Sequence, residues 1–117
     1  MAASATPQAA ITTSVHVKVI VDPVNTAAFL AALKRAQTVV TALPESVSWE
    51  LYHKPEAPGE FRYTENWNAS LEWIMAAAAE NEACQEYFAT TEKMLIKPRE
   101  MEVWTRMDGD GWVVLKE

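Results

Sequence analysis

Four stretches of this 117-residue chain alternate apolar and polar side chains, and two longer stretches repeat apolar residues every three or four positions. A period of two places successive side chains on opposite faces of a strand, whereas a period near 3.6 gives an apolar stripe along a helix. The order of these patterns limits the possible folds more strongly than composition does. The predicted strands are residues 11–21, 46–54, 60–67 and 99–107.

The first helical pattern follows Asp22-Pro23, which ends the first strand. Asn25 or Thr26 can cap this helix, because short polar side chains accept hydrogen bonds from the free N–H groups of a first turn. Pro44 is expected to end it. The apolar stripe consists of Phe29, Leu33, Ala36, Val40 and Leu43.

The second helical pattern begins at Asn68 or Ser70, and polar residues 80–82 predict a kink within it. It is expected to continue to Lys97, because Pro98 disfavours helical backbone in the residue before it. After the last strand, the Asp-Gly-Asp-Gly run at 108–111 favours a turn. Residues 112–117 form either a short fifth strand or an ordered tail.

The order β-α-β-β-α-β predicts an α+β, ferredoxin-like fold in which two helices cover one face of a four-stranded antiparallel sheet. Residues 11–117 form a single domain, and residues 1–10 are expected to be a flexible tail. Depending on register, the uncovered sheet face would carry Ile20, Tyr52 and Trp104. Because exposed apolar faces favour association, a homodimer that packs sheet against sheet is expected.

The formal net charge of −6 disfavours nucleic acid and anionic membranes as partners. No segment has the roughly 18 consecutive apolar residues of a membrane-spanning helix. Cys84 is the single cysteine, so an intrachain disulfide is excluded. Residues 1–10 lack the basic and apolar regions of a signal peptide, and we therefore expect a cytoplasmic protein.

Three runs of sequence point to a known family: FLAAL at 29–33, ENWNAS at 65–70 and KPREMEVW at 97–104. Over residues 12–107 the chain resembles the antibiotic biosynthesis monooxygenase family of dimeric α+β barrels, in particular fungal members found beside polyketide genes. The resemblance implies a homodimer with a pocket in each subunit between the sheet and the helices.

The resemblance also implies a reaction. Enzymes of this family oxidise phenolic polyketides such as anthrones with molecular oxygen, and they use neither a metal nor a flavin cofactor. The substrate itself, once deprotonated, supplies the electrons. The protein must bind a flat aromatic molecule, assist deprotonation and exclude water. The expected partner is therefore an aromatic small-molecule substrate in secondary metabolism.

The chain departs from the family at one position. Haem-degrading relatives and many bacterial members carry a histidine about nine residues after the tryptophan that corresponds to Trp67, and Ala76 occupies that place here. Alanine neither ligates iron nor transfers a proton, so haem binding by that route is disfavoured. Cyclase, isomerase, dehydratase and decarboxylase activities stay open, as does a non-catalytic protein that binds a small molecule or assists another enzyme.

Glu65 is the first candidate for catalysis because it shares a strand face with three aromatic residues, Phe61, Tyr63 and Trp67. Apolar surroundings would raise its pKa and make it able to accept a phenolic proton. The alternative is a structural ion pair with Arg99, Arg62 or a group of a partner subunit.

His53, His16 and Asn66 are further catalytic candidates. The two histidines are the side chains whose ordinary pKa lies near neutrality. His16 would face the dimer interface if the valines of the first strand pack on the helices, and the pocket if the register is reversed. The resemblance implies an amide near Asn66 that orients oxygen or substrate, although in a regular strand Asn66 points away from its two neighbours.

Apolar residues that could stack a polycyclic ligand cluster around the second helix, with a core position as the alternative for each. Trp73 and Phe88 are the preferred contacts, and Arg99 could hold a phenolate or form a salt bridge with Glu100 or Glu102. Histidines and Cys84 are too dispersed for a metal site, and Cys84 has no evident base to activate it. The substrate-binding candidates are Tyr63, Trp67, Trp73, Met75, Tyr87, Phe88 and Arg99, with Leu95 as a further apolar residue.

Overall fold

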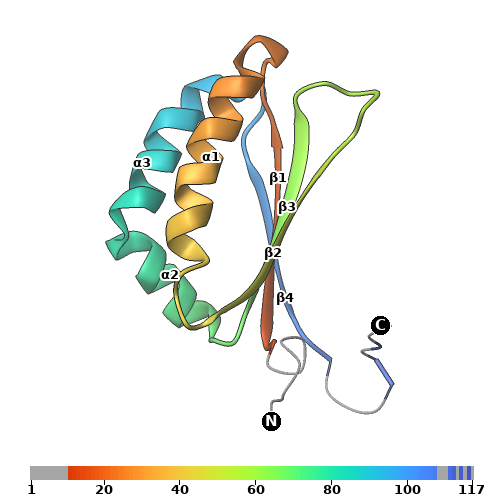
Figure 1. The fold of residues 1–117 in the computed structure, drawn as a ribbon, viewed down its shortest axis with the longest axis vertical. Helices are drawn as coiled ribbons and strands as arrows, with labels where there is room; N and C mark the ends of the chain where they lie inside the picture. Colours follow the sequence, from red (N-terminus) through yellow and green to blue (C-terminus); the bar gives the residue numbers. More distant parts are fainter. Residues whose placement is uncertain (1–10, 108–110, 113, 115, 117) are drawn as a thin grey trace.

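The computed structural model describes residues 11–107, 111–112, 114 and 116, and it has the ferredoxin-like α+β architecture expected from the order of patterns. Three helices lie on one side of a four-stranded sheet (Figure 1). The strand order is β2-β3-β1-β4, and each neighbouring pair is antiparallel. The elements are β1 (Thr13–Ile20), α1 (Thr26–Val40), β2 (Ser46–His53), β3 (Glu60–Trp67), α2 (Leu71–Glu80), α3 (Glu82–Thr91) and β4 (Glu100–Thr105).

The register of β1 decides which side chains face the helices. Alternate residues of β1 are buried, and they include Val15, Val17 and Val19. Val15 lies opposite Glu65 of β3 and Val103 of β4. Because directly opposed residues of antiparallel strands share a face, the burial of the valines also turns Glu65 toward the helices.

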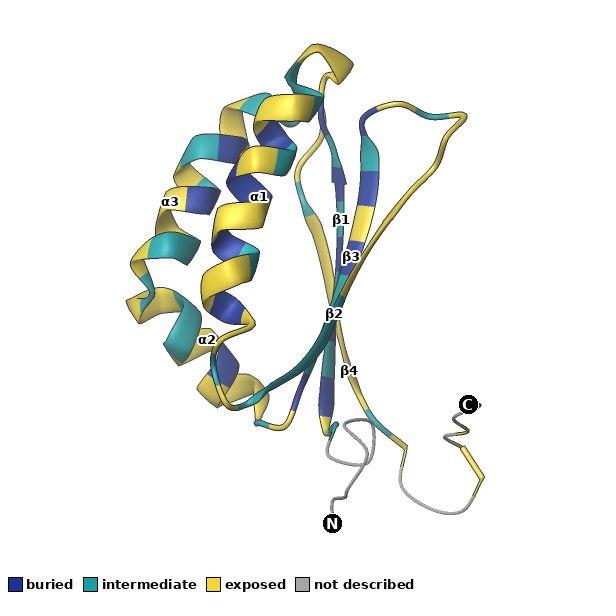
Figure 2. Ribbon diagram, viewed as in Figure 1, coloured by how far each residue is buried: buried dark blue, intermediate teal, exposed yellow. Residues whose placement is uncertain are grey.

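The hydrophobic core fills the space between this inner face of the sheet and the helices (Figure 2). Phe29 of α1 is fully buried and stacks on Phe61 of β3, with ring centroids 5.4 Å apart. The apolar stripe predicted for the first helix is largely confirmed, since Phe29, Leu33, Ala36 and Val40 are all buried. This packing fixes α1 over the two central strands.

The predicted kink in the second helix is a complete break. Asn81 has extended backbone angles (φ −89°, ψ 115°) and separates α2 from α3. Its side chain accepts a hydrogen bond from the backbone N–H of Cys84, while Ser70 caps α2 by accepting from the N–H of Trp73. The helical segment therefore consists of two short helices, each with its own N-cap.

Two helix ends differ from the predictions. The first helix ends at Val40 rather than at Pro44, and its start at Thr26 follows a 3₁₀ turn that Asp22 caps. The α-helical part of the second segment ends at Thr91, and a 3₁₀ turn over Glu92–Met94 follows it before the chain reaches Lys97. The helix ends early because the following chain hydrogen-bonds to the end of β1: the N–H of Asp22 donates to the carbonyl of Met94, and the N–H of Ile96 donates to that of Ile20.

The described residues include only part of the two ends of the chain. The tail expected at residues 1–10 lies outside the described residues, as do residues 108–110 of the predicted turn. Of the expected fifth strand or ordered tail, Trp112 lies in a bend, and Val114 and Lys116 have no assigned strand.

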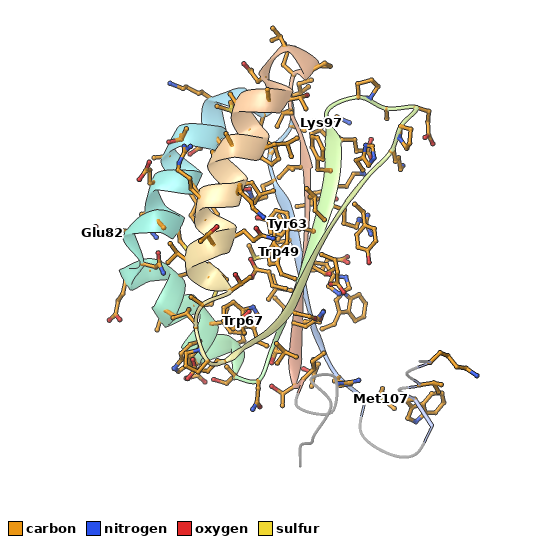
Figure 3. All side chains as sticks on the ribbon, viewed as in Figure 1. Trp49, Tyr63, Trp67, Glu82, Lys97 and Met107 are labelled. Carbon is orange, nitrogen blue, oxygen red and sulfur yellow. The ribbon has the colours of Figure 1, made fainter. Side chains whose placement is uncertain are left out.

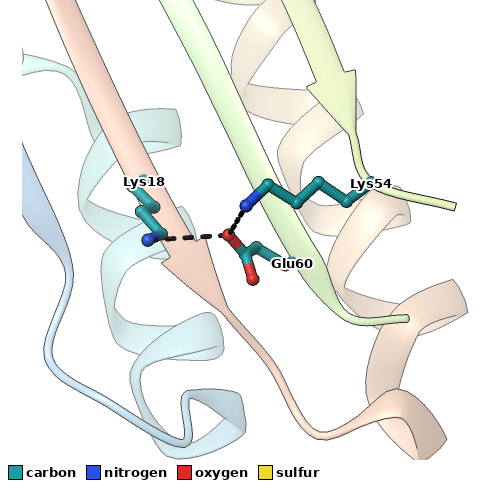
Figure 4. A network of polar contacts seen from close by, with 3 residues as sticks. All are labelled: Lys18, Lys54 and Glu60. Carbon is teal, nitrogen blue, oxygen red and sulfur yellow. Dashed lines mark ion pairs between the residues drawn. The ribbon is translucent and has the colours of Figure 1, made fainter. Parts of the chain in front are cut away.

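The outer face of the sheet carries Ile20, Tyr52 and Trp104, as expected, but most of its other side chains are polar. Glu60 lies there between two lysines, 3.5 Å from Lys18 and 3.3 Å from Lys54 (Figure 4). Desolvation raises the pKa of Glu60, but hydrogen bonds and charge from Lys54 and Lys18 outweigh it and lower the pKa overall. The apolar side chains of this face therefore lie among charged and polar ones in the described strands.

Replacing Gly59 with alanine is expected to destabilise the fold by at least about 2 kcal/mol. Gly59 has a φ of +91°, and an added Cβ would collide with the carbonyl oxygen of Val21. Gly111→Ala is the matched control, because Gly111 also has a positive φ (+83°) but no atom within 4 Å of an added Cβ. Urea unfolding of both variants measures the difference. Equal losses would contradict the role given to the collision.

Candidate functional site

A cavity of about 240 Å³ lies between the inner face of the sheet and the helices. Strands β1 and β3 form its floor, and α2 and α3 form its roof on either side of the break at Asn81. The end of α1 and the residue Leu43 after it close one side. Most of its lining is apolar, and the polar side chains among the described lining residues are Tyr63, Glu65, Asn81, Cys84 and Gln85.

We infer the mouth of the cavity from the exposed lining residues of β4 and α2. All residues of β4 are exposed, and Met101 of its inner face keeps 47% of its surface accessible while lining the cavity. On the facing helix, Met75 lines the cavity and is 55% exposed. Two flexible methionines at an opening can adjust to a ligand that enters from solvent.

Glu65 is the carboxylate of the cavity. Its Oε1 accepts a hydrogen bond from the Trp67 indole N–H at 3.2 Å. Burial raises the pKa of Glu65, and hydrogen bonds from Trp67 and Trp49 offset this effect only in part. Figure 3 shows Trp49, Tyr63 and Trp67 directed from the sheet toward the helices, so that Glu65 lies within an aromatic wall. A carboxylate held this way is a stronger proton acceptor than one in water.

The ion pairs considered for Glu65 are not formed within the described residues. Arg62 points to the outer face, because it lies one residue from Tyr63 and Phe61 in a regular strand. Arg99 instead donates from a guanidinium nitrogen to the Thr91 hydroxyl at 3.1 Å. The partners of Glu65 are neutral indoles, which satisfy its oxygen without neutralising its charge.

Arg99 is not placed for either of the two roles suggested for it, which were to hold a phenolate in the cavity or to pair with Glu100 or Glu102. It forms no salt bridge with Glu100 or Glu102 among the described ion pairs, and it does not line the cavity. Its guanidinium carbon lies 5.0 Å from the centroid of the Phe88 ring and 5.3 Å from that of Tyr87. Cation–π contacts of this kind hold Phe88, which does line the cavity, against the helix layer.

Tyr63 and Tyr87 connect the floor and the roof behind the cavity. Their hydroxyl oxygens lie 3.2 Å apart, and both residues are buried. Burial raises the pKa of Tyr63, with further contributions from Tyr87 and Glu65. Tyr63 therefore stays a neutral phenol that lines the cavity, whereas Tyr87 is a core residue that does not line it.

His16 and Asn66 lie on the outer face of the sheet, away from the cavity. Asn66 uses its Nδ2 to donate to Ser48 Oγ at 2.9 Å, which leaves Oδ1 to accept from Ser14 Oγ at 2.6 Å. Because the single proton of the Ser14 hydroxyl is engaged, His16 Nε2 must be the donor in its 2.9 Å contact with Ser14. His16 therefore does not activate Ser14 as a nucleophile.

His53 and Trp73 share the helix-facing side of the fold but do not line the cavity. His53 is exposed at the end of β2, opposite Phe61. Trp73, at the start of α2, packs on Trp67 with ring centroids 6.0 Å apart. Leu95 pairs with Val21 at the far end of β1. Of the predicted candidates, the cavity brings together Tyr63, Glu65, Trp67, Met75 and Phe88.

Several lining residues were not among the predicted candidates. Leu71, Ile74 and the alanines 77–79 come from α2, and Cys84 and Gln85 come from α3. The alternation of the last strand could have indicated Met101 and Val103. Burial raises the pKa of Cys84, and the nearby charge of Glu65 adds to this, so the residue stays a thiol.

Within the described residues, no group of three or more His, Cys, Asp or Glu side chains could hold a metal ion. None of the helices in that part of the chain has the length and apolar character needed to cross a bilayer.

Solved structures of known proteins share this fold. A candidate antibiotic biosynthesis monooxygenase of Nitrosomonas europaea superposes with a TM-score of 0.71 at 17% identity, covering 79% of this chain and 95% of that one. Another, of Caulobacter crescentus, gives a TM-score of 0.74 at 15% identity, covering 84% and 92%. The protein Rv0793 of Mycobacterium tuberculosis gives 0.73 at 19% identity, covering 85% and 98%.

A candidate monooxygenase of Pestalotiopsis microspora is 34% identical over 115 residues, which is 98% of this chain and 92% of that protein. The chain belongs to the antibiotic biosynthesis monooxygenase family. This membership confirms the resemblance found in the sequence, including its similarity to fungal members. No protein-family model matches this chain.

Replacing Glu65 with glutamine is expected to change how stability depends on pH. Because the folded protein binds the Glu65 proton more tightly than the unfolded chain does, the wild type loses stability as pH rises from the unfolded pKa, near 4.5, through the raised folded pKa. Glutamine cannot ionise, yet it keeps an oxygen for the Trp67 indole. Each unit of difference between the two pKa values contributes about 1.4 kcal/mol.

Urea unfolding of wild type and Glu65→Gln between pH 4.5 and pH 8 measures this effect. The stability of the wild type relative to the variant should fall with rising pH and then become constant. Glu50→Gln, which changes a carboxylate on the outer face, is the control and should not remove this fall. A constant difference between wild type and Glu65→Gln over the whole range would contradict a buried, pKa-raised Glu65.

Proposed function

We propose that this protein is an oxygenase that oxidises an aromatic phenol or anthrone-type substrate with molecular oxygen, using the substrate itself as the electron donor. The observation that carries the proposal is a single pKa-raised carboxylate, Glu65, in an otherwise largely apolar cavity. Family membership supports the reaction class. The substrate class and a place in secondary metabolism come from the chemistry of the cavity and from the family resemblance.

The cavity offers what each step of this reaction requires. Trp67 and Phe88 provide faces on which an aromatic ring can pack. Glu65 accepts a proton from the substrate, and the resulting anion is rich enough in electrons to react with oxygen. For an anthrone, one oxygen atom becomes the new carbonyl oxygen, and the other leaves as water with the two hydrogens of the oxidised carbon.

The apolar walls contribute by excluding water from the reacting anion. A carboxylate in this setting is a better base than in water, because the proton transfer relieves an unfavourable buried charge. The neutral indole of Trp67 keeps Glu65 oriented during the transfer, at 3.2 Å from its Oε1. General-base catalysis by a positioned group of this kind contributes about 10²- to 10⁴-fold to a rate.

Oxygen uptake in the presence of an anthrone and of a dihydroxynaphthalene tests the proposal, with buffer alone as the blank for spontaneous oxidation. We expect quinone formation in air and none under nitrogen. Glu65→Gln should lower kcat by about 10² or more, because it cannot accept a proton. Glu50→Gln is the matched control and should keep wild-type kcat.

Other outcomes would give other reactions. Product formation under both air and nitrogen would overturn the oxygenase in favour of an acid–base reaction such as isomerisation or cyclisation. Binding without turnover would indicate a small-molecule-binding protein. Loss of activity in His53→Asn with full activity in Glu65→Gln would move the base to His53.

The proposal includes a homodimer in which the outer sheet faces of two subunits pack together. Tyr52 and Trp104 support it, since they lie on this face and are 55% and 56% exposed. Sedimentation velocity at micromolar concentration should give a dimer for the wild type and a monomer for the double variant Tyr52→Glu, Trp104→Glu. Val24→Glu is the control and should stay dimeric. Val24 is an apolar residue that is 83% exposed, and it does not lie on the outer face of the sheet. A monomeric wild type would overturn this packing.

A further inference from the structure

We propose that the cavity selects uncharged aromatic alcohols, that it encloses two fused rings and gains little affinity from a third, and that it discriminates against aromatic carboxylates. This inference rests on the proposed function, whose substrate class it narrows. It is carried by the volume of the cavity, by the fixed position of its walls and by the distribution of charge around it.

The volume sets the size of the ligand. An apolar protein cavity of about 150 Å³ holds benzene, which corresponds to roughly 25 Å³ for each carbon atom. At 240 Å³ the cavity of this protein has room for roughly ten non-hydrogen atoms on the same scale. Two fused aromatic rings fill it, whereas the third ring of an anthrone would extend through the mouth between β4 and α2.

The walls opposite the mouth are held in place and cannot easily enlarge the cavity. Phe88 is packed between the Tyr87 ring, 5.3 Å away between centroids, and the guanidinium of Arg99. On the floor, Val17 is almost fully buried in the core. Enlarging the cavity on these sides would disrupt the close packing of the core. A larger ligand therefore gains little by entering more deeply.

The charge around the cavity disfavours anions. Glu65 is negative when ionised, and none of the described lining residues is cationic. Arg99 does not line the cavity: its guanidinium lies over the Phe88 ring and donates to the Thr91 hydroxyl. An aromatic carboxylate would lose its water shell on entry without gaining a cation, and it would be repelled by Glu65.

The hydrogen-bonding groups favour a ligand that donates a hydrogen bond. Asn81 accepts from the backbone N–H of Cys84, and Gln85 donates from its side chain to the carbonyl of Ala78. One polar atom of each amide, Asn81 Oδ1 and Gln85 Nε2, is thus engaged at the break between α2 and α3. Glu65 keeps acceptor capacity beyond its bond with Trp67, so the hydroxyl of an aromatic alcohol has a partner there.

Isothermal titration calorimetry under nitrogen, which prevents turnover, tests the inference with four probes: phenol, 2-naphthol, 2-hydroxyanthracene and 2-naphthoic acid. We expect 2-naphthol to bind at least about tenfold more tightly than phenol, because the second ring is buried. The third ring should add less than about threefold, and 2-naphthoate should bind at least about tenfold more weakly than 2-naphthol.

Two variants connect this selectivity to the cavity. Ala78→Leu fills part of it and should weaken 2-naphthol by at least about tenfold while phenol still binds. Ala76→Leu changes an exposed alanine of the same helix that does not line the cavity, and it should leave both affinities unchanged. Retained phenol binding shows that Ala78→Leu is folded. Equal effects of the two leucines on 2-naphthol would overturn the assignment of the binding site.

Two results would overturn the selectivity: 2-hydroxyanthracene binding tenfold more tightly than 2-naphthol, or 2-naphthoate binding as tightly as 2-naphthol. Absence of binding by every aromatic alcohol would also overturn it. These results are independent of oxygen consumption. If 2-naphthol binds as expected but neither the dihydroxynaphthalene nor the anthrone is oxidised in the activity assay, the selectivity stands and the oxygenase does not. If 2-hydroxyanthracene binds most tightly and the anthrone is oxidised, the oxygenase stands and the selectivity does not.

Discussion

The burial of one row of valines under the helices is the constraint on which the structure depends. Val15, Val17 and Val19 lie on β1, which is hydrogen-bonded to both β3 and β4. Once this row faces the helices, the alternation of strands fixes the direction of every side chain opposite it. Glu65 faces inward for this reason, since it is paired with Val15, although a carboxylate would be better solvated on the outer face.

The inward position of Glu65 has an energetic cost that the protein reduces without removing it. An ion pair with arginine would have lowered the pKa of the carboxyl group and made it a poor base. The hydrogen bond from Trp67 instead satisfies one oxygen and preserves the raised pKa. Arg99 instead contacts Phe88 and Thr91 and forms no ion pair with Glu65 among the described residues. Stability is thus reduced at the point where the proposed reaction requires a base.

The break between α2 and α3 provides the space above this carboxylate. Asn81 and the alanines 77–79 all line the cavity, because the helix layer changes direction over the sheet. Alanines at these positions leave room that larger side chains would fill. A roof of small residues therefore lies above the Glu65 carboxylate on the floor of the cavity.

The sequence by itself determined the element order, the strand β3, a cap at Asn68 or Ser70, an irregularity at residues 80–82 and the apolar stripe of α1, because these features depend on local periodicity and capping chemistry. It also identified Glu65, Trp67 and Phe88 as candidates. Only the tertiary structure decided which strand faces meet the helices, because a one-residue change of register inverts every side chain. That choice brought Glu65 into the cavity and placed Asn66 and His16 outside it. Contacts distant in sequence also ended the second helical segment early. They placed Arg99 against Phe88, whereas the sequence had suggested that it holds a substrate phenolate.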